Sequence, residues 1–372
     1  MKKLTHRMLP KARTFNVTVL LIVLTCLFLP SRTFAAKKLS DPSPQTYTVM
    51  VGLEQSSLGI GINSYFPRTI TIHTGDTVHW MINLNEIHTV TILGGIFPPD
   101  LLSPSADLGA DPAISPLVFT PFVVEQSPLS GSEFGGGLGA HANSGIMGRE
   151  PGQVEEYDLT FTTEGTFGYY CIVHGFAMSG EVIVVSSDEA IPSPKQAAAE
   201  GKKEIAEALS LVPGVVMNSS EQVVPPEMNN DGTLTHTVMV GYSEIVTASY
   251  GDLEIDLMQF FPKRLTVRSG DIVDFVMSEY NTAPHTATFL NGAEEPPLAV
   301  FENGFLYLNS EVIFPSGGDV LTRNGIFSSG LMLPIPGTTY SLEIGNMKPG
   351  LLRFLCLLHD GSGMKGELMV LP

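Results

Sequence analysis

The strongest constraint on the fold of this 372-residue chain is that one pattern of short β-prone runs occurs in it twice. The first copy opens with TYTVMVG at Thr46 to Gly52, and the second opens with THTVMVG at Thr235 to Gly241. A second shared block is FPRTITIHTGDTVHW, starting at Phe66, which corresponds to FPKRLTVRSGDIVDF, starting at Phe261. Alternation on both sides of a Gly-Asp pair predicts two strands joined by a tight turn. Internal repetition of this kind indicates one β fold built twice.

Each copy ends in a loop that combines three soft or borderline metal ligands. The sequences are GTFGYYCIVHGFAMSGEVIVV, which starts at Gly165, and PGLLRFLCLLHDGSGMKGELMVL. A thiolate, an imidazole and a thioether together favour copper over zinc, calcium or magnesium. The candidate ligands, in chain order, are Cys171, His174 and Met178 in the first loop and Cys356, His359 and Met364 in the second. Two loops of the same design predict two metal sites.

A trigonal blue-copper site also needs a second histidine, and each copy supplies one upstream of its cysteine. These are His88 in NEIHTVTIL and His285 in TAPHTATFL. With this ligand order, both copies resemble the cupredoxin family of plastocyanin, azurin, amicyanin and pseudoazurin. The resemblance implies a type 1 copper in each copy, so two copper ions per chain, held by His88, Cys171, His174 and Met178 and by His285, Cys356, His359 and Met364. The first ligand loop is one residue shorter than the second, a difference that bears on the tuning of the first site.

The resemblance also implies the fold class. We expect an all-β protein of two tandem Greek-key cupredoxin β-sandwiches, joined by a linker that contains one α-helix. The expected domains are residues 44–186 and 233–372, with the linker at 187–232. In the linker, Ser193 and Pro194 are suited to the N-cap and first position of a helix, which we expect to end at Val212 before Pro213. The face expected to dock on a sandwich is formed by Ala198, Ile205, Leu209 and Val212.

The N-terminal segment predicts export. Basic residues precede an apolar run from Phe15 to Leu29, and Thr33-Phe34-Ala35 is a small-x-small cleavage site. We therefore expect residues 1–35 to be a signal peptide and the mature chain to be periplasmic, on the cell surface or secreted, without a stable membrane span. A retained N-terminal anchor is the alternative. Removing this segment also removes Cys26, which leaves one cysteine per copy and favours two metal thiolates over a disulfide.

Charge narrows the classes of partner. The whole chain has a net charge of −18, and the part after residue 35 retains 14 basic and 38 acidic residues, a net charge of −24. Nucleic acid and anionic membrane surfaces are therefore unfavourable partners. A redox partner protein with a cationic docking patch would be attracted. The alternative is that the acidity serves only solubility.

Long inserted segments separate the early histidine from the cysteine in both copies. They span Ile96 to Gly148 and Gly292 to Gly330, and such loops in compact domains usually serve a function. We expect them to cover the copper end or the face between the domains. Each contains a similar tetrapeptide, SGIM ending at Met147 and SGLM ending at Met332, whose methionine is either a competing axial ligand or a core side chain.

Three functions fit these residues. The leading one is electron transfer by a blue copper protein, because a site closed by protein ligands leaves no position for a substrate. A copper oxidoreductase of the nitrite-reductase type, with an additional copper between subunits, and a copper store or carrier are the alternatives. The oxidase and reductase motifs of the fold are missing, because no His-x-His occurs and Tyr170 and Leu355 precede the cysteines. The histidines outside the proposed sites are His6, His73, His79, His141 and His236.

Overall fold

The structure is a computed structural model that describes residues 43–149 and 153–372. The described residues belong to one compact unit, Pro42–Pro372. They form mostly strands, with one long helix, which confirms the predicted all-β class. The predicted signal peptide and Cys26 lie outside the described residues. Within the described residues, no helix combines the length and apolar character needed to cross a bilayer.

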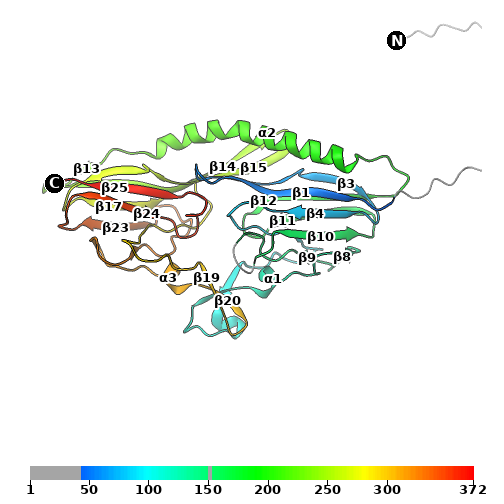
Figure 1. Cartoon of the computed structure of the whole chain (residues 1–372), viewed down its shortest axis with the longest axis horizontal. Coiled ribbons are helices and arrows are strands. Elements are labelled where there is room, and N and C mark those ends of the chain that lie inside the picture. The colour runs from blue at the N-terminus through cyan, green and yellow to red at the C-terminus, as the bar shows by residue number, and fades with distance from the viewer. Residues whose placement is uncertain (1–42, 150–152) are drawn as a thin grey trace, which may run out of the picture. The chain divides into compact units, whose positions relative to one another are not determined.

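The largest sheet contains strands from both copies of the repeat. Its strand order is β21-β23-β17-β14-β15-β2-β1-β4-β10-β8, and β13 pairs with β14 (Figure 1). From the first copy come β1 (Thr46–Gln55), β2 (Ile60–Phe66), β4 (Thr77–Met81), β8 (Ser132–Phe134) and β10 (Glu156–Phe161). From the second come β13 (Glu227–Met228), β14 (Leu234–Ala248), β15 (Gly251–Phe261), β17 (Ile272–Met277), β21 (Val320–Leu321) and β23 (Thr339–Ile344).

A smaller sheet completes a sandwich in each copy. The first has the order β3-β12-β11-β5-β9, and the second has the order β16-β25-β24-β18-β22. Their bounds are β3 (Thr69–His73), β5 (Thr91–Ile92), β9 (Ala142–Asn143), β11 (Gly165–Cys171), β12 (Gly175–Val185), β16 (Arg264–Val267), β18 (Thr288–Phe289), β22 (Phe327–Ser328), β24 (Gly350–Leu355) and β25 (Lys365–Val370). Each sandwich encloses its own apolar core, centred on Trp80 in the first copy and on Phe275 in the second. The predicted β-sandwich is thus confirmed.

The two strands around each Gly-Asp turn do not pair with each other. β3 pairs with β12 in the smaller sheet, whereas β4 pairs with β1 and β10 in the large sheet, so the turn carries the chain from one layer to the other. Asp76 fixes this crossing, because its carboxylate accepts the backbone N–H groups of Gln45 at 2.7 Å and His73 at 2.9 Å. Asp271 accepts two backbone N–H groups in the same way in the second copy.

The two copies are fused by direct pairing of β2 with β15. The strands are antiparallel, and Gly61 lies opposite Asp256 in the register. Gly61 and Asp256 are also equivalent positions of the repeat, since both lie five residues before the shared Phe-Pro pair. A local twofold axis therefore passes beside this pair. Every residue of β2 is buried, as expected for a strand in the middle of a sheet.

The linker helix covers this junction. α2 (Pro194–Ser219) contacts β1 and β2 of the first copy and β14 and β15 of the second (Figure 1). It begins as predicted, with a Ser193 capping box, but the predicted end at Val212 is wrong, because the helix continues through Pro213 and is followed by a 3₁₀ turn, η2 (Ser220–Gln222). Ala198 is exposed, which corrects the expected face. The buried positions are Ala197, Gly201, Glu204, Ala208, Val212, Val215 and Ser219.

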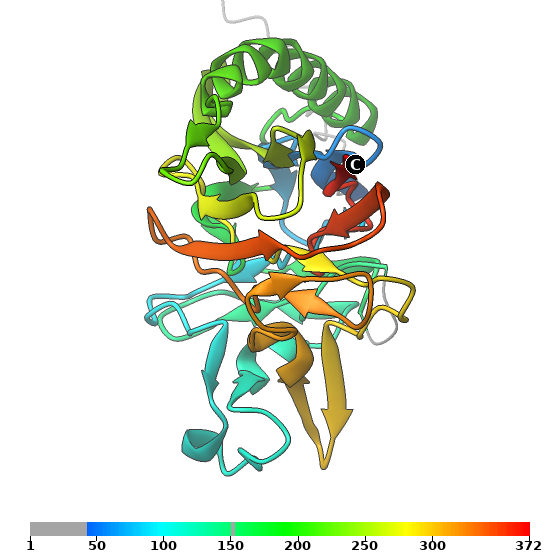
Figure 2. The same cartoon turned by 90° about the vertical axis from the view of Figure 1, so that its left-hand side faces the viewer.

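The inserted segments of the two copies build a further sheet together. Its order is β19-β20-β7-β6, so that strands of the second copy pair with strands of the first (Figure 2). The side chain of Ser115 donates to the Leu308 carbonyl at 2.6 Å across this contact. Ile87 and Ile172, which neighbour the predicted ligands, pack on the same apolar cluster. The elements are β6 (Leu102–Pro104), η1 (Ser105–Leu108), β7 (Leu117–Phe119), α1 (Pro121–Val124), β19 (Ala299–Glu302), β20 (Phe305–Leu308) and α3 (Ser310–Ile313).

Candidate metal centres

The first candidate centre lies at the end of β11. Cys171 is the last residue of that strand, His174 lies in the turn that follows, and His88 comes from the segment between β4 and β5. The Cys171 sulfur is 3.4 Å from Nδ1 of His174 and 3.8 Å from Nδ1 of His88. Met178, on β12, is fully buried in the same core as the cysteine. The structure therefore brings the predicted Cys and both His side chains together from two distant parts of the chain.

The second candidate centre repeats this arrangement. The Cys356 sulfur is 3.5 Å from Nδ1 of His359 and 3.7 Å from Nδ1 of His285, and the two Nδ1 atoms are 2.9 Å apart. Met364 shares the buried core with Cys356, and its backbone N–H donates to the His359 carbonyl at 3.0 Å. Both cysteines are free and fully buried, and each sulfur lies beside the two histidines of its own copy.

Each cysteine sulfur also accepts a backbone hydrogen bond from the residue after the early histidine. Thr89 donates to Cys171 at 3.3 Å, and Thr286 donates to Cys356 at the same distance. The hydroxyls of these threonines in turn accept from the backbone N–H groups after the cysteines, at 2.9 Å from Ile172 and 2.8 Å from Leu357. These hydrogen bonds thus join the histidine segment directly to the cysteine loop.

A glycine in the opening strand makes room for each early histidine. Gly52 has a φ of +68°, and a Cβ atom at this position would lie 2.8 Å from Nε2 of His88. At Gly241, with a φ of +71°, a Cβ atom would lie 2.4 Å from Nε2 of His285. Both glycines fall where the pairing of the strand with its neighbour shifts register. The glycine that closes each copy of the repeated TVMVG sequence is therefore part of the site.

The repeated SGIM and SGLM sequences hold the early histidines through the backbone. Met147 and His88 exchange two backbone hydrogen bonds of 2.8 and 3.0 Å, and Met332 and His285 exchange an equivalent pair. Both methionines are buried in the sandwich cores, which agrees with the reading of them as core side chains. The serine hydroxyl of each tetrapeptide accepts the backbone N–H of the second residue after the histidine. In the first copy, the Val90 N–H donates to Ser144 Oγ at 2.8 Å.

The electrostatics of both centres favour thiolates. Burial alone would raise the pKa of Cys171, but the charge of His174 and hydrogen bonds from His174 and His88 hold it well below the usual value. The same balance, with His359 and His285, lowers the pKa of Cys356. A deprotonated sulfur with two imidazole nitrogens beside it, away from water, is the donor set that suits copper. The residues present therefore fit a copper ion in each centre.

A third group of ligating atoms lies between the two centres and was not predicted. It consists of Glu86, Asp256 and His174, with one ligating atom of each lying within 4.8 Å of the others. Burial opposes ionisation of Glu86, but the hydrogen bond and charge of His174, then the charge of His359, lower its pKa to about 2. Burial, followed by the charges of Glu254 and Glu86, raises the pKa of Asp256 to about 7. The repeat gave no signal for this group, because Ala283 stands where the first copy has Glu86.

The remaining described histidines have contacts away from the two centres. His73 lies 2.9 Å from the Glu189 carbonyl, His79 is 2.8 Å from Asp158, and His236 is 3.6 Å from Asp271. His141 packs its ring on Phe122, with the ring centres 5.1 Å apart.

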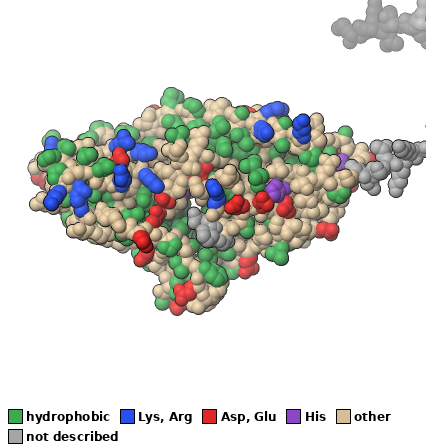
Figure 3. All heavy atoms as spheres, viewed as in Figure 1, with side chains coloured by type: hydrophobic (Ala, Val, Ile, Leu, Met, Phe, Trp, Pro, Cys, Tyr) green, Lys and Arg blue, Asp and Glu red, His purple; other side chains and the backbone are tan. Residues whose placement is uncertain are grey.

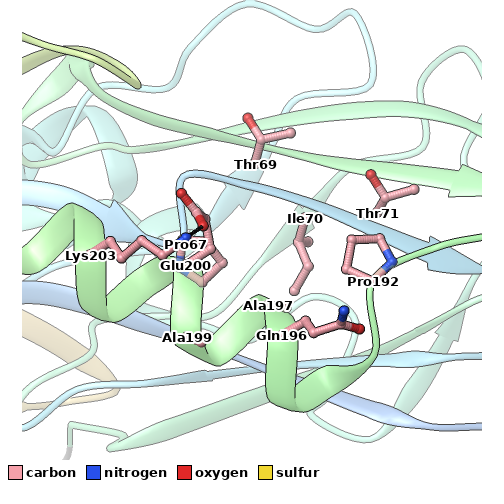
Figure 4. A pocket seen from close by; sticks show the side chains of 10 residues that line it. All are labelled: Pro67, Thr69, Ile70, Thr71, Pro192, Gln196, Ala197, Ala199, Glu200 and Lys203. Carbon is pink, nitrogen blue, oxygen red and sulfur yellow. Dashed lines mark hydrogen bonds and ion pairs between the residues drawn. The ribbon is translucent and has the colours of Figure 1, made fainter.

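A surface pocket of about 410 Å³ lies between α2 and β3, also away from the two centres (Figure 4). Apolar and hydroxyl side chains line most of it, including Ile70, Ala197 and Thr69. Its charged side chains, Glu200 and Lys203, are paired with each other at 2.6 Å (Figure 4). The pocket contains no residue of the candidate donor sets.

Known proteins are similar to part of the chain. No family model matches the sequence. The chloroplastic plastocyanin of Chlamydomonas reinhardtii is 28% identical over 141 residues, which are 36% of this chain and 77% of that protein. An oxidised amicyanin variant has 20% identity and a TM-score of 0.22, covering 38% of this chain and 82% of its own. A reduced Cu(I) form of another amicyanin variant has 21% identity and a TM-score of 0.22, covering 41% and 90%. The plastocyanin match, the sandwiched sheets and the two Cys-His constellations together give this chain a cupredoxin-like β-sandwich fold.

Proposed function

We propose that the protein carries electrons through two type 1 copper centres, one in each copy of the repeat. The observation that supports this most directly is the duplicated donor set of one buried cysteine and two histidines, with a buried methionine on or directly before the following strand. Copper bound in such a set would exchange one electron between Cu(I) and Cu(II). We assign Cys171, His88, His174 and Met178 to the first centre, and Cys356, His285, His359 and Met364 to the second.

The chain's own residues would keep each centre rigid and dry. The cysteines supply thiolate sulfur without a proton, and the backbone N–H groups of Thr89 and Thr286 stabilise that negative charge at 3.3 Å. Each imidazole presents Nδ1 to the thiolate, which leaves Nε2 for a partner within the protein. Because strands and cross-linked loops hold these groups, little reorganisation accompanies a change of charge, as fast electron transfer requires.

The export of the protein and the nature of its partner are further parts of this proposal. The N-terminal sequence supports a periplasmic, cell-surface or secreted location. The net acidity supports a redox partner with a cationic docking patch. The acidity is not uniform, because Lys and Arg side chains gather over the C-terminal half of the face in Figure 3, while acidic side chains lie nearer its middle. The partner would therefore dock outside that basic region.

The proposal is tested by colour and metal content. We expect the copper-loaded protein to bind two copper ions and to show an intense blue absorption when oxidised. Cys171→Ser and Cys356→Ser should each remove one copper and the absorption of one centre, because serine cannot supply the thiolate. His73→Ala, which alters a histidine outside the centres, is the matched control and should keep both.

A copper-loaded protein without the blue absorption would contradict the proposal. The two other functions have their own signatures. A third copper with steady reduction of nitrite or dioxygen would indicate the oxidoreductase, and freely exchangeable copper without a reversible redox wave would indicate the store or carrier.

A further inference from the structure

The ligand ends of the two centres meet at one carboxylate. Oε1 of Glu86 lies 3.2 Å from Nε2 of His174 and 4.0 Å from Nε2 of His359. Glu86 belongs to the first copy, so this contact joins the two halves of the chain. The side chains of Glu86 and His174 are 6% exposed and that of His359 is 9% exposed. A partner protein therefore cannot contact the Nε2 edges of His174 and His359. Glu86 lies between these two rings.

The surrounding residues hold Glu86 in this position. The Glu54 carboxylate accepts the backbone N–H groups of Asn85 at 2.7 Å and Glu86 at 3.2 Å. The Asn85 side chain reaches the other half and donates to the carbonyl of Gly361, in the second ligand loop, at 3.1 Å. Gly61 leaves the space that the carboxylate fills, because a Cβ atom there would lie 3.0 Å from Oε2 of Glu86. The position of Glu86 is thus determined from both halves.

The protons of the two histidines are compatible with a bridge. A histidine that binds a metal through Nδ1 carries its proton on Nε2, and such N–H groups usually donate to a carboxylate or carbonyl. His174 and His359 both direct Nδ1 at a cysteine sulfur and Nε2 at Glu86. Glu86 lies within hydrogen-bond distance of the His174 ring and within ion-pair distance of the His359 ring, and an ionised carboxylate has acceptor positions for both. The bridge therefore needs no further proton or ion.

We infer that the two centres are electronically connected, and that an electron delivered to one passes to the other inside the chain through His174, Glu86 and His359. This inference rests on the proposed function. In the step, one centre is oxidised by one electron and the other is reduced by one electron. No bond forms or breaks, and both Nε2 protons stay on their rings. Glu86 acts as a positioning residue, which shortens the gap between the imidazoles and fixes their orientation.

The first test detects the contacts of Glu86 with His174 and His359 directly and does not depend on electron transfer. In the diamagnetic Cu(I) protein with ¹⁵N-labelled histidine, we expect Nε2–H proton signals of His174 and His359 that exchange slowly with water. Glu86→Gln should shift both signals, since an amide replaces the shared carboxylate. Asp158→Asn alters another carboxylate beside a histidine, with 2.8 Å between Asp158 and His79, and should leave both signals unchanged.

The second test measures transfer between the centres. Met364→Gln is introduced into every protein so that the two potentials differ, because the axial ligand tunes the potential. After reduction by less than one electron per chain with a radiolysis pulse, we expect a first-order phase whose rate does not depend on protein concentration. Glu86→Leu should slow this phase by about tenfold or more, because leucine accepts no hydrogen bond from His174 and places no negative charge beside His359. Asp158→Asn should not change it, and Glu86→Gln supplies a second variant if Glu86→Leu folds poorly.

The outcomes separate this inference from the proposed function. Failure of both centres to show the blue absorption would reject the proposed function. Two blue centres without a concentration-independent phase, or with a phase that Glu86→Leu leaves unchanged, would reject the inference alone. A third metal ion bound by Glu86, Asp256 and His174 would also reject it, because a cation on Nε2 replaces the proton that Glu86 accepts.

Discussion

At the scale of single residues, the glycines beside the early histidines are as important as the ligands. The rings of His88 and His285 occupy the space that a side chain would take at Gly52 and Gly241. Any residue with a Cβ atom would meet the ring there, and would also adopt a positive φ that such residues avoid. A site that depends on the orientation of an imidazole therefore depends on a residue that offers no ligand.

Gly52→Ala tests this dependence. We expect it to displace the ring of His88, to remove the blue absorption of the first centre and to lower the free energy of unfolding by roughly 1–3 kcal/mol. Copper titration with visible spectra, together with chemical unfolding, measures both effects. Gly75→Ala is the control, since Gly75 has a φ of +93° and no heavy atom within 4 Å of the added Cβ. Retention of both blue centres in Gly52→Ala would show that the ring has another position.

The sequence was sufficient to predict the site residues that the two copies share. It was insufficient to predict the site residues that occur in one copy alone. Repetition of His, Cys and His in one order predicted the groups of three side chains that the structure brings together at Cys171 and Cys356. Glu86 escaped prediction because two of its neighbours, Asp256 on β15 and His359 in the second ligand loop, lie far away in the chain. Only the folded junction shows that one acidic side chain serves two histidines.

At the scale of elements, α2 shows how tertiary packing overrides a local signal. Pro213 removes a backbone donor, which predicts a break. The helix nevertheless continues to Ser219, because Val212 and Val215 on either side are buried in the cluster formed by β2 and β15. Packing on both copies thus offsets the cost of one proline, and a prediction from local residues alone ends the helix too early.

The same helix carries a pH-sensitive contact. Glu204 is buried and accepts the backbone N–H of Arg68 at 2.8 Å. Burial raises its pKa from 4.5 to about 7. The folded state therefore binds the Glu204 proton more tightly than the unfolded state does. The free energy of unfolding that this proton contributes is fully present below pH 4.5 and is lost as the pH rises through about 7.

Glu204→Gln should remove this pH-dependent loss of stability, and its amide oxygen can still accept the backbone N–H of Arg68. Relative to the wild type, we expect the variant to gain roughly 1–3 kcal/mol in unfolding free energy between pH 5 and pH 8. Chemical unfolding at both pH values measures the difference. Glu200→Gln, at an acidic side chain that is 55% exposed, should show no such gain. Parallel pH profiles for Glu204→Gln and the wild type would contradict the assignment.

At the scale of the whole described unit, the pairing of β2 with β15 follows a local twofold axis. Gly61 and Asp256 face each other across it and are equivalent in the repeat. The first half on its own would expose the β2 edge, and an exposed edge readily pairs with another strand. Two copies of β2 could pair in the register that β2 now makes with β15, which gives a symmetric contact.

We therefore expect residues 44–186, expressed alone, to form a dimer through β2. Light scattering after size-exclusion chromatography measures the mass, and Ile62→Lys should yield monomers, since Ile62 lies beside Gly61 on this edge. Cys171→Ser, which alters the metal site and not the edge, should remain dimeric. A monomeric, folded fragment at micromolar concentration would show that the edge is protected in another way.

The sheet formed by the two inserted segments has a consequence for motion. Strands β7 and β20 join the copies on one side, β2 and β15 join them through the large sheet, and α2 spans the same junction. Because the two copies are connected at these separate places, neither can rotate as a rigid body relative to the other. The distance between the two centres is then fixed by the architecture, so electron transfer between them would not require a gating movement. Its rate would therefore not depend on solvent viscosity.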